Sequence, residues 1–596
     1  MKNLNQAEKA DLVGKLKSLS GLTDDERASL IELLNQHKKY GLVWEDKPEL
    51  AEQELKTKLP ILREVKERAI VNDAGAPNHI LIEGDNLHAL TALSYTNAGK
   101  IDVIYIDPPY NTGNKDFVYN DSYVDSEDSY RHSKWLSFME KRLRITKQIL
   151  SDRGVIIISI NTIEFAQLKL LCDEIFGERN FIGHITWEST TQPTNAGSAK
   201  YGLQQKVESI LLYAKIKDNV KGFNLMPVDK NLSYPHKGRF GACRLEIIEK
   251  SDAGTYNRKS MKFPIMGHYP REGKRWQIGI ETAAELVARG RIEIDNGIVK
   301  KAVYPEDEMD KISFIPFWSH LEASIVGTAQ NGKDELNTIM NKAMGFDTVK
   351  PITLIRKLIF HCADKSSIVL DFFAGSGTTL HATMQLNAED GGHRQCILVT
   401  NNENGICENV TYERNKRVID GYTTPRGEKV AGLRANNLRY YKVKAVPRDS
   451  TVKSRMRLAA GSTDLLCIME NLYQEKETFG LMTLDKRCRY FEEKGRGMLV
   501  VLDTDLIPQI VEQLKQLTPA QPVHLYVYAP SDYAFDEEFE EVADKVELYP
   551  LPQPILNAYK QWLPKQDEVM IDIPNDYQMT EEQLNETGED FRTNEE

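Results

Sequence analysis

The stretch 101-IDVIYIDPPYNTG-113 decides the fold of this 596-residue chain. Its first six residues, 101–106, are mostly apolar and run into a loop with two prolines, which predicts a strand buried in a parallel sheet. The carboxyl ends of parallel strands line the ligand crevice of such a sheet. We therefore expect Asp107-Pro108-Pro109-Tyr110 to lie where chemistry takes place.

The composition of this loop suits the recognition of an exocyclic amine. Two successive prolines fix φ and remove two N–H donors, which leaves a stiff loop whose carbonyls point outward. The Asp107 carboxylate and a proline carbonyl offer two acceptors to the two N–H bonds of an amine. Tyr110 can stack on the ring that carries the amine. A strand-terminating turn without a ligand is the alternative interpretation.

The sequence around this stretch alternates between apolar runs and helical patterns, which predicts an α/β fold with a mostly parallel sheet covered on both faces. The alternation stops at about residue 222 and resumes at about 346, so a long insertion interrupts one sheet. The predicted strands are 79–82, 101–106, 155–160, 181–187, 209–213, 368–373, 396–400, 498–503 and 523–528, and the predicted helices of the sheet include 135–150 and 351–362.

The chain is longer than one hydrophobic core usually organises, so several domains are expected. Its first 75 residues are rich in Leu, Lys and Glu at helical spacing. The predicted segments are a helical N-terminal region 1–75, the first half of the sheet domain 76–221, the insertion 222–345, the second half of the sheet domain 346–440, a further α/β domain 441–565 and an acidic tail 566–596.

A second motif, 371-DFFAGSGTT-379, also follows a predicted strand and opens a helix. Its glycines allow the backbone to approach a ligand closely, and the helix N-terminus favours a negative group. A P-loop would need Lys where Thr378 stands, and the dinucleotide fingerprint would need Gly where Leu380 stands. Alone, this loop is equally compatible with a structural turn, so its significance depends on the pairing with the first motif.

The two motifs together resemble those of S-adenosylmethionine-dependent DNA amino-methyltransferases. The order resembles the permuted β class, because the first motif precedes the second by 264 residues. The chain is most similar to the Mod (modification) subunits of type III restriction–modification systems. The resemblance implies a Rossmann-like methyltransferase sheet, a target recognition domain at 222–345 and an assembly domain at 441–565. Supporting strings are GLVWEDKPE at 41–49, EGDNLHAL at 83–90, KPITLIRKLI at 350–359 and NNLRYYKVK at 436–444.

The resemblance also assigns roles to individual residues. The catalytic set Asp107, Pro108, Pro109 and Tyr110 would hold a flipped adenine, whose exocyclic N6 receives the methyl group. The cofactor would be S-adenosyl-L-methionine. The Gly-rich loop would surround its methionine part, and an acid or amide at the end of the next strand would bind its ribose. Helix capping or solvation is the alternative for the acids and for the lysine. The implied cofactor residues are Asp85, Lys350, Asp371, Phe373, Gly375, Gly377, Asn401 and Glu403, with Glu403 favoured over Asn401 for the ribose.

The first part of the insertion is locally basic. Between residues 222 and 279, eleven Lys and Arg residues face five acids, for a net charge of +6, and aromatic residues are interleaved with them. This mixture is expected for phosphate contacts combined with base readout, although a solvated basic face would have the same composition. The candidate DNA-binding residues are Lys237, Arg239, Arg244, Arg258, Lys259, Lys262, Arg271, Lys274 and Arg275.

Taken alone, the net charge of −12 argues against a nucleic-acid partner. Residues 566–596 carry eleven acids and one arginine, however, so the acidity belongs mainly to the C-terminal end. The chain has no apolar leader and no long apolar run, and its seven cysteines form no CxxC pair. We expect a cytoplasmic protein with reduced thiols and without a metal, since no HxxxH or HExxH pair is present.

The leading functional hypothesis is a site-specific adenine-N6 methyltransferase of duplex DNA that flips its target base. By resemblance it would be a homodimer and would pair with a Res-type nuclease–translocase. The alternatives are a cytosine-N4 methyltransferase, an RNA methyltransferase, a scaffold role in which methylation is secondary, and a solitary regulatory methyltransferase. An Asp at position 107, where a Ser would favour cytosine, favours adenine.

Overall fold

The computed structural model forms two compact units, each of which is considered by itself. The larger unit combines Met1–Gly222 with Trp318–Glu596, and the smaller one is Phe223–Phe317. The structure describes residues 15, 42–113, 116–120, 122–192, 202–228, 233–253, 258–308, 313–346, 348–529 and 535–564.

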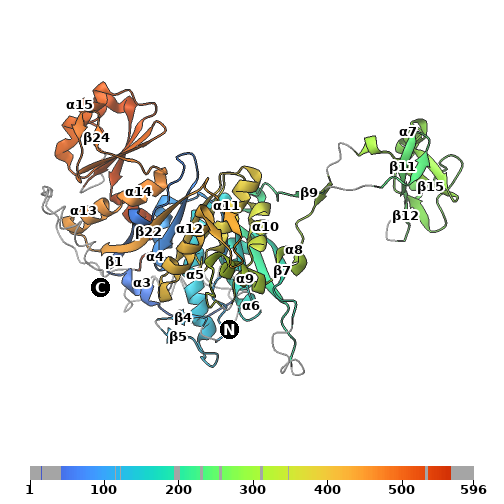
Figure 1. The fold of residues 1–596 in the computed structure, drawn as a ribbon, viewed down its shortest axis with the longest axis horizontal. Helices are drawn as coiled ribbons and strands as arrows, with labels where there is room; N and C mark the ends of the chain where they lie inside the picture. Colours follow the sequence, from blue (N-terminus) through green and yellow to red (C-terminus); the bar gives the residue numbers. More distant parts are fainter. Residues whose placement is uncertain are drawn as a thin grey trace. The chain divides into compact units, whose positions relative to one another are not determined.

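The larger unit is built on a ten-stranded sheet (Figure 1). From β22 to β6 the neighbouring strands are parallel, whereas β8 is antiparallel to both of its neighbours and β1 is antiparallel to β22. The strands, in spatial order, are β1 (Lys58–Glu64), β22 (Asn437–Pro447), β2 (Asn78–Glu83), β19 (Gln395–Thr400), β18 (Ile368–Asp371), β3 (Ile101–Ile106), β6 (Leu150–Ile160), β8 (Val207–Ala214), β7 (Phe181–Glu188) and β17 (His320–Leu321).

Helices cover this sheet on both faces. The consecutive residues Ile80, Leu81 and Ile82 of β2 are all fully buried, which is possible only if neither face of the strand meets solvent. The predicted α/β fold class is therefore confirmed. The helices of the sheet domain are α3 (Leu50–Glu54), α4 (Asn86–Thr96), α5 (Arg131–Ile149), α6 (Phe165–Cys172), α8 (Ala323–Val326), α9 (Ala329–Met340), α10 (Ile352–Cys362), α11 (Thr378–Asp390) and α12 (Glu413–Asp420).

The strand order brings the two sequence motifs together. Strand β18 pairs directly with β3, and Val369 and Leu370 lie opposite Val103 and Ile104. Because the two strands are parallel, the loops that follow them leave the same edge of the sheet. Strands β19 and β2 lie next to β18 on its other side. Four neighbouring strand ends therefore line one edge, although two of the strands come from before the insertion and two from after it.

The N-terminal region differs from the helical prediction for 1–75. Residues 58–64 form strand β1, which pairs with β22 along its whole length. Ile61 and Leu62 point to opposite faces, and both are fully buried. Pro60 is tolerated because β1 is an edge strand. The helices predicted before residue 42 lie outside the described residues, apart from Lys15, which is helical.

The C-terminal region contains the predicted second sheet, but its boundary is displaced. Strand β22 runs through the predicted boundary at 440/441 and belongs to the large sheet. Tyr559 from the C-terminal region belongs to the same hydrophobic cluster as Ile61 and Leu90. The elements are β23 (Glu475–Lys476), β26 (Cys488–Glu493), β27 (Arg496–Val501), β28 (Val523–Tyr528), β29 (Val546–Leu551), α13 (Val452–Gly461), α14 (Thr463–Glu470), α15 (Ile507–Gln516) and α16 (Gln553–Lys560).

Four short antiparallel strand pairs complete the described strands outside the main sheets. They are β4 (Val118–Tyr119) with β5 (Ser122–Tyr123), β9 (Met226–Val228) with β16 (Ser313–Ile315), β20 (Gly421–Thr423) with β21 (Lys429–Ala431), and β24 (Thr478–Phe479) with β25 (Met482–Thr483).

The smaller unit has its own core, in which Trp276 and Phe263 pack with Ile265. The compact unit ends at Phe317, not at residue 345 as predicted for the insertion. Helix α9 belongs to the larger unit, because Leu336 and Met340 pack there against Val349. The elements of the smaller unit's sheets are β10 (His236–Gly238), β11 (Gly241–Ile247), β15 (Ile298–Val303), β14 (Ile292–Asp295), β12 (Glu249–Ser251), β13 (Lys274–Trp276) and helix α7 (Ile280–Ala288).

The burial of β1 generates a stability prediction. We expect Leu62→Ala to lower the free energy of unfolding by about 2–5 kcal/mol, because it removes a fully buried side chain from the sheet. The matched change at half-exposed Leu50 should cost no more than about 0.5 kcal/mol. Urea denaturation of both variants measures the difference, and equal small effects would show that β1 is not an integral part of the sheet.

Candidate active site

Asp107 follows β3 and forms the centre of a polar network. Its two carboxylate oxygens accept hydrogen bonds from Lys350 Nζ at 2.9 and 2.8 Å, and the Tyr110 hydroxyl donates to Oδ1 at 2.8 Å. Lys350 precedes α10 and is one of the cofactor residues that the resemblance implies. The structure instead places its ammonium group on the Asp107 carboxylate, which corrects that expectation.

Glu208 is a member of this network that the sequence reasoning missed. It lies on β8, where it pairs with Trp187 of β7, and its Oε2 lies 2.9 Å from the Tyr110 hydroxyl. The same oxygen lies 3.4 Å from Lys350 Nζ. Glu208 could have been identified from the sequence, because it is an acid in the mostly apolar strand VESILLYA. A buried acid is rare unless it is paired.

Burial and charge set the protonation states in this network. Burial alone would lower the pKa of Lys350, which is only 7% exposed, but the Asp107 and Glu208 carboxylates outweigh burial and raise it. Burial, followed by the same two carboxylates, raises the pKa of Tyr110 well above its usual value. Lys350 is therefore an ammonium ion and Tyr110 a neutral phenol at neutral pH.

Side chains from other elements bind Pro109 and Asn111 of this loop, whereas the Pro108 carbonyl accepts no hydrogen bond from the part of the chain that the structure describes. Trp135 Nε1 donates to the Pro109 carbonyl at 2.7 Å. Asn111, with φ at 56°, donates to the buried Glu164 at 2.6 Å. Among the described residues, the Pro108 carbonyl accepts no hydrogen bond. The loop thus contains the two acceptors expected for an amine, the Asp107 carboxylate and the unbonded Pro108 carbonyl.

Asp371 stabilises the Gly-rich loop from within. Its Oδ1 accepts from the Phe373 N–H at 3.0 Å and its Oδ2 accepts from the Thr379 hydroxyl at 2.5 Å. Burial raises the pKa of Asp371 to about 7, although the two donors act in the opposite direction. Its carboxylate closes the loop, whereas the half-buried Phe373 ring packs against Phe138 of α5 at 5.9 Å.

The two glycines of the loop differ in their surroundings. Gly377 has φ at 74°, and a Cβ there would meet Asn415 Nδ2 at 2.5 Å, so this position needs glycine for packing within the protein. Gly375 has φ at 48°, and a Cβ there would meet nothing closer than the Phe373 carbonyl at 3.8 Å. Only Gly375 therefore exposes backbone in open space that a ligand can approach.

The neighbouring strand ends carry the remaining predicted residues. Asp85 caps α4, with Oδ1 accepting from the N–H groups of Leu87 at 2.7 Å and His88 at 3.3 Å. Its Oδ2 lies 3.6 Å from Arg142 Nη2, and its side chain is 41% exposed. Asn401 and Glu403 follow β19 and are exposed. Helix α4 is also tied to the Gly-rich loop, because Asn86 Nδ2 donates to the Phe372 carbonyl at 3.0 Å.

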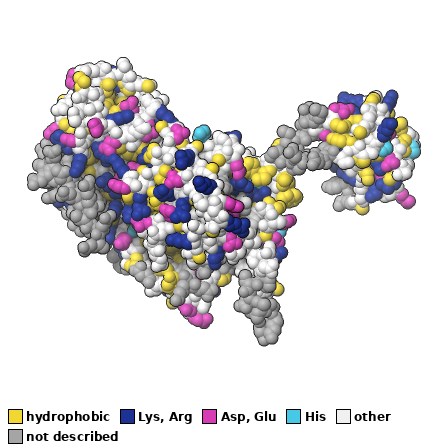
Figure 2. All heavy atoms as spheres, in the orientation of Figure 1, with side chains coloured by type: hydrophobic (Ala, Val, Ile, Leu, Met, Phe, Trp, Pro, Cys, Tyr) yellow, Lys and Arg dark blue, Asp and Glu magenta, His cyan; other side chains and the backbone are white. Residues whose placement is uncertain are grey.

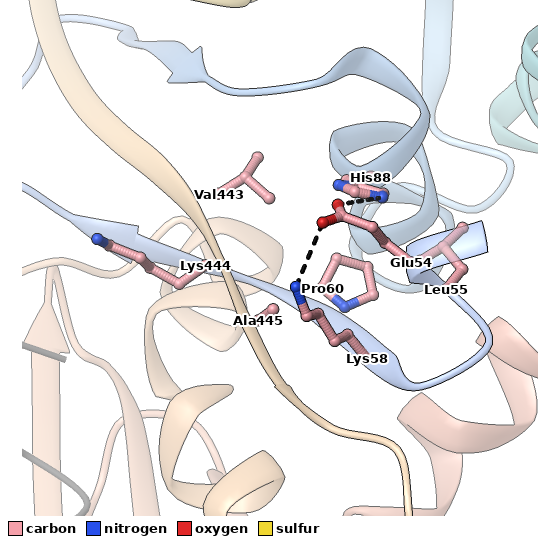
Figure 3. Close-up of a pocket in the computed structure, with 8 residues that line it drawn as sticks. All are labelled: Glu54, Leu55, Lys58, Pro60, His88, Val443, Lys444 and Ala445. Atoms are coloured by element: carbon pink, nitrogen blue, oxygen red, sulfur yellow. Dashed lines mark hydrogen bonds and ion pairs between the residues drawn. The ribbon is translucent and has the colours of Figure 1, made fainter. Parts of the chain in front are cut away.

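A separate cavity of about 260 Å³ lies where α3, α4, β1 and β22 meet (Figure 3). None of the residues predicted for catalysis or cofactor binding lines it. Over the described part of the chain, no group of three or more His, Cys, Asp or Glu residues is arranged to hold a metal ion, and the seven cysteines are unpaired. The same residues include no helix that is both long and apolar enough to span a bilayer.

The sheet order and the two adjoining loops define the class of this protein. An α/β sheet that places a Pro-Pro loop beside a Gly-rich loop at one edge has the arrangement that the resemblance to methyltransferases implies. The particular family follows from comparison with known proteins. Residues 101–420, more than half of the chain, match the family model described as DNA methylase. The chain belongs to this family.

The chain is also similar to individual known proteins and to solved structures. The Mod subunit of the type III restriction–modification enzyme StyLTI of Salmonella typhimurium is 32% identical over 63% of this chain and 60% of its own length. The type II methyltransferase M.KpnI of Klebsiella pneumoniae is 34% identical over 58% of this chain and 85% of its own. The solved PvuII cytosine-N4 DNA methyltransferase is 11% identical, with a TM-score of 0.31, over 57% of this chain and 88% of its own. The predicted resemblance to Mod subunits is confirmed.

The raised pKa of Asp371 predicts a pH dependence of stability. A carboxyl that binds its proton more tightly in the folded state contributes stability below its ordinary pKa, and that stability is lost as the pH rises through the folded value near 7. The wild-type protein should therefore lose a few kcal/mol between about pH 4 and pH 7 relative to Asp371→Asn, which cannot ionise. Urea denaturation of both proteins at several pH values tests this, and parallel pH profiles would contradict it.

Proposed function

We propose that this protein is an S-adenosyl-L-methionine-dependent DNA methyltransferase that transfers a methyl group to adenine N6. One observation supports this most strongly: the free Pro108 carbonyl and the Asp107 carboxylate lie at a strand end next to the Gly-rich loop. Membership of the DNA methylase family supplies the reaction class. Asp at position 107 favours adenine over cytosine as the target base, and product analysis decides between them.

The residues along the strand ends fit this cofactor. Gly375 offers open backbone, Phe373 a half-buried aromatic face, and Asp85 a partly exposed carboxylate. Asn401 and Glu403 are exposed at the neighbouring strand end, where a ribose is commonly held in such sheets. When bound, S-adenosyl-L-methionine supplies an electrophilic methyl group. Lys350 is not part of this set, because Asp107 and Glu208 hold its ammonium group.

The catalytic loop activates the amine by positioning and hydrogen bonding. Adenine N6 is a weak nucleophile because its lone pair is delocalised into the ring. Acceptors at Asp107 and the Pro108 carbonyl draw its hydrogens toward them and localise that lone pair. Tyr110 stacks on the base. This chemistry requires no covalent bond to the protein, but it requires the adenine to leave the duplex, so we include base flipping in the proposal.

The smaller unit is the proposed target recognition domain. Figure 2 shows Lys and Arg side chains on its surface beside exposed hydrophobic ones. Four of the candidate DNA-binding residues are paired with acids of the same unit, as in Arg271–Glu249 at 2.7 Å. The others have no acidic partner among the described residues and are the better phosphate ligands. The paired residues are Arg244, Lys262, Arg271 and Arg275, and the others are Lys237, Arg239, Arg258, Lys259 and Lys274.

We further propose the biological setting from the relatives. Because the chain resembles Mod subunits, it would act as the modification and specificity subunit of a type III restriction–modification system in the cytoplasm. It would form a homodimer and associate with a Res-type nuclease–translocase. The C-terminal α/β region, residues 441–564, is the proposed assembly part. Mass measurement in solution, with and without a co-expressed partner, tests this arrangement.

The proposed reaction predicts separable effects of two substitutions. The wild-type protein should transfer label from S-adenosyl-L-methionine to adenine in unmethylated plasmid DNA of mixed sequence. Asp107→Ala should abolish transfer and retain cofactor binding, because Lys350 still contacts Glu208. Phe373→Ala should instead weaken cofactor binding by roughly tenfold, as expected for the loss of about 1–2 kcal/mol of ring contact. Labelled methyl-cytosine as the product, or no label in DNA from a folded wild-type protein, would refute the proposal.

The ion pairs in the smaller unit predict which basic residues contact phosphate. Lys237→Ala should lower the slope of log affinity against log salt concentration by about 0.9, as expected for one lost phosphate contact. Arg271→Ala should change this slope less, because Glu249 already neutralises its guanidinium group. Fluorescence anisotropy with duplex DNA at several salt concentrations measures both slopes. A larger effect at Arg271 than at Lys237 would show that the ion pair opens on binding.

A further inference from the structure

The Tyr110 hydroxyl occupies a position between two carboxylates. It lies 2.8 Å from Asp107 Oδ1 and 2.9 Å from Glu208 Oε2, and it accepts a hydrogen bond from Lys350 Nζ at 2.9 Å. A phenol has one proton to donate. It can therefore donate to either carboxylate, but not to both at once. Such a hydroxyl can take a proton from one neighbour while it gives its own proton to the other.

The proposed methyl transfer generates a proton that must leave the active site. When the N–C bond forms at N6, the C–S bond of the methyl donor breaks and the sulfur keeps the electron pair. The methylated nitrogen is then cationic until it loses one hydrogen as a proton. Asp107 is the carboxylate positioned at that amine in the proposed function, and Lys350, as an ammonium ion, has no lone pair with which to accept.

We propose that Glu208 is the terminal proton acceptor of the reaction, reached from Asp107 through the Tyr110 hydroxyl. This inference rests on the proposed function. The proton moves from N6 to Asp107, the Tyr110 oxygen takes it from Asp107 Oδ1, and the original phenol proton passes to Glu208 Oε2. Asp107 is again a carboxylate and Tyr110 again a phenol at the end of the relay. The neutral methylamine, the sulfide and a protonated Glu208 account for every atom and charge.

The charge balance of the network suits the uptake of one proton. One ammonium ion and two carboxylates give a net charge of −1 in a largely buried group, and a single proton brings it to zero. Glu208 is 11% exposed, so it retains a route by which it can return the proton to solvent. The neighbouring titratable groups are otherwise engaged, because Tyr105 is bonded to Ser159 at 3.0 Å and Asp371 to Thr379.

The same chain contains a matched control for a purely structural role. Five residues further along β8, the Tyr213 hydroxyl donates to Asp173 at 2.7 Å, and Lys169 Nζ donates to the same carboxylate at 2.7 Å. This group repeats the combination of tyrosine, carboxylate and lysine without any link to the catalytic loop. Asp173→Asn therefore reports what the loss of such a carboxylate costs the fold.

The test is single-turnover methylation of unmethylated plasmid DNA by Glu208→Gln across a range of pH. Glutamine keeps the size and the acceptor oxygen of the side chain but cannot take a proton. We expect the rate to fall about 100-fold, within the usual contribution of general base catalysis, with affinity for S-adenosyl-L-methionine unchanged. The wild-type rate should rise with pH and reach a plateau, whereas the variant should show no such rise. Glu208→Asp should restore the rise at an intermediate rate, and Asp173→Asn should match the wild type.

Two outcomes would overturn the relay. If Glu208→Gln retains the wild-type rate and pH profile, the proton leaves by another route. If it loses cofactor affinity and thermal stability together with rate while the rise with pH persists, Glu208 has only a structural role. Neither outcome affects the proposed function, which fails only if the wild-type protein itself leaves adenine in the DNA unmethylated, and in that case the relay fails with it.

Discussion

The backbone hydrogen bonds between β18 and β3 hold together two loops that lie 264 residues apart in the chain. Parallel pairing makes both strands end at the same edge, and β19 and β2 extend that edge on one side. A shift of register by one residue would turn every side chain of the shifted strand to the opposite face of the sheet. The Pro-Pro loop and the Gly-rich loop therefore depend on this one ladder, and the position of the exposed Glu403 depends on the next ladder, between β18 and β19.

The second constraint is electrostatic. A buried ammonium ion is costly unless it is paired, and Lys350 is paired with both Asp107 and Glu208. These contacts orient the Asp107 carboxylate and the Tyr110 hydroxyl, so the groups that stabilise the buried charge are also the groups proposed to face the substrate. The Trp135 contact to Pro109 completes the arrangement and leaves the carbonyl of the preceding proline available.

Several strands could be predicted from local sequence, because a short apolar run indicates a buried strand without information from distant residues. The apolar runs at 101–106 and 523–528 coincide with β3 and β28, and the predicted strand 79–82 is extended by one residue at each end. Strand β1 could not be predicted in this way. Its leucines fit a helical spacing, and its extended state comes from pairing with β22, which lies almost 400 residues away. The end of the smaller unit at residue 317 likewise depends on packing that local composition does not encode.

The kinds of chemistry that the site offers follow from local sequence alone. Two prolines make a stiff loop of acceptors, and glycines make a backbone that can adopt positive φ, because these properties belong to the residues and their immediate neighbours. Tertiary structure alone decided which side chains meet. It assigned Lys350 to Asp107 and not to the cofactor, and it brought Glu208 to Tyr110 from a strand almost one hundred residues further on. Charged groups pair when they lie close together in the folded protein. The distance between two residues along the chain does not give their distance in the fold.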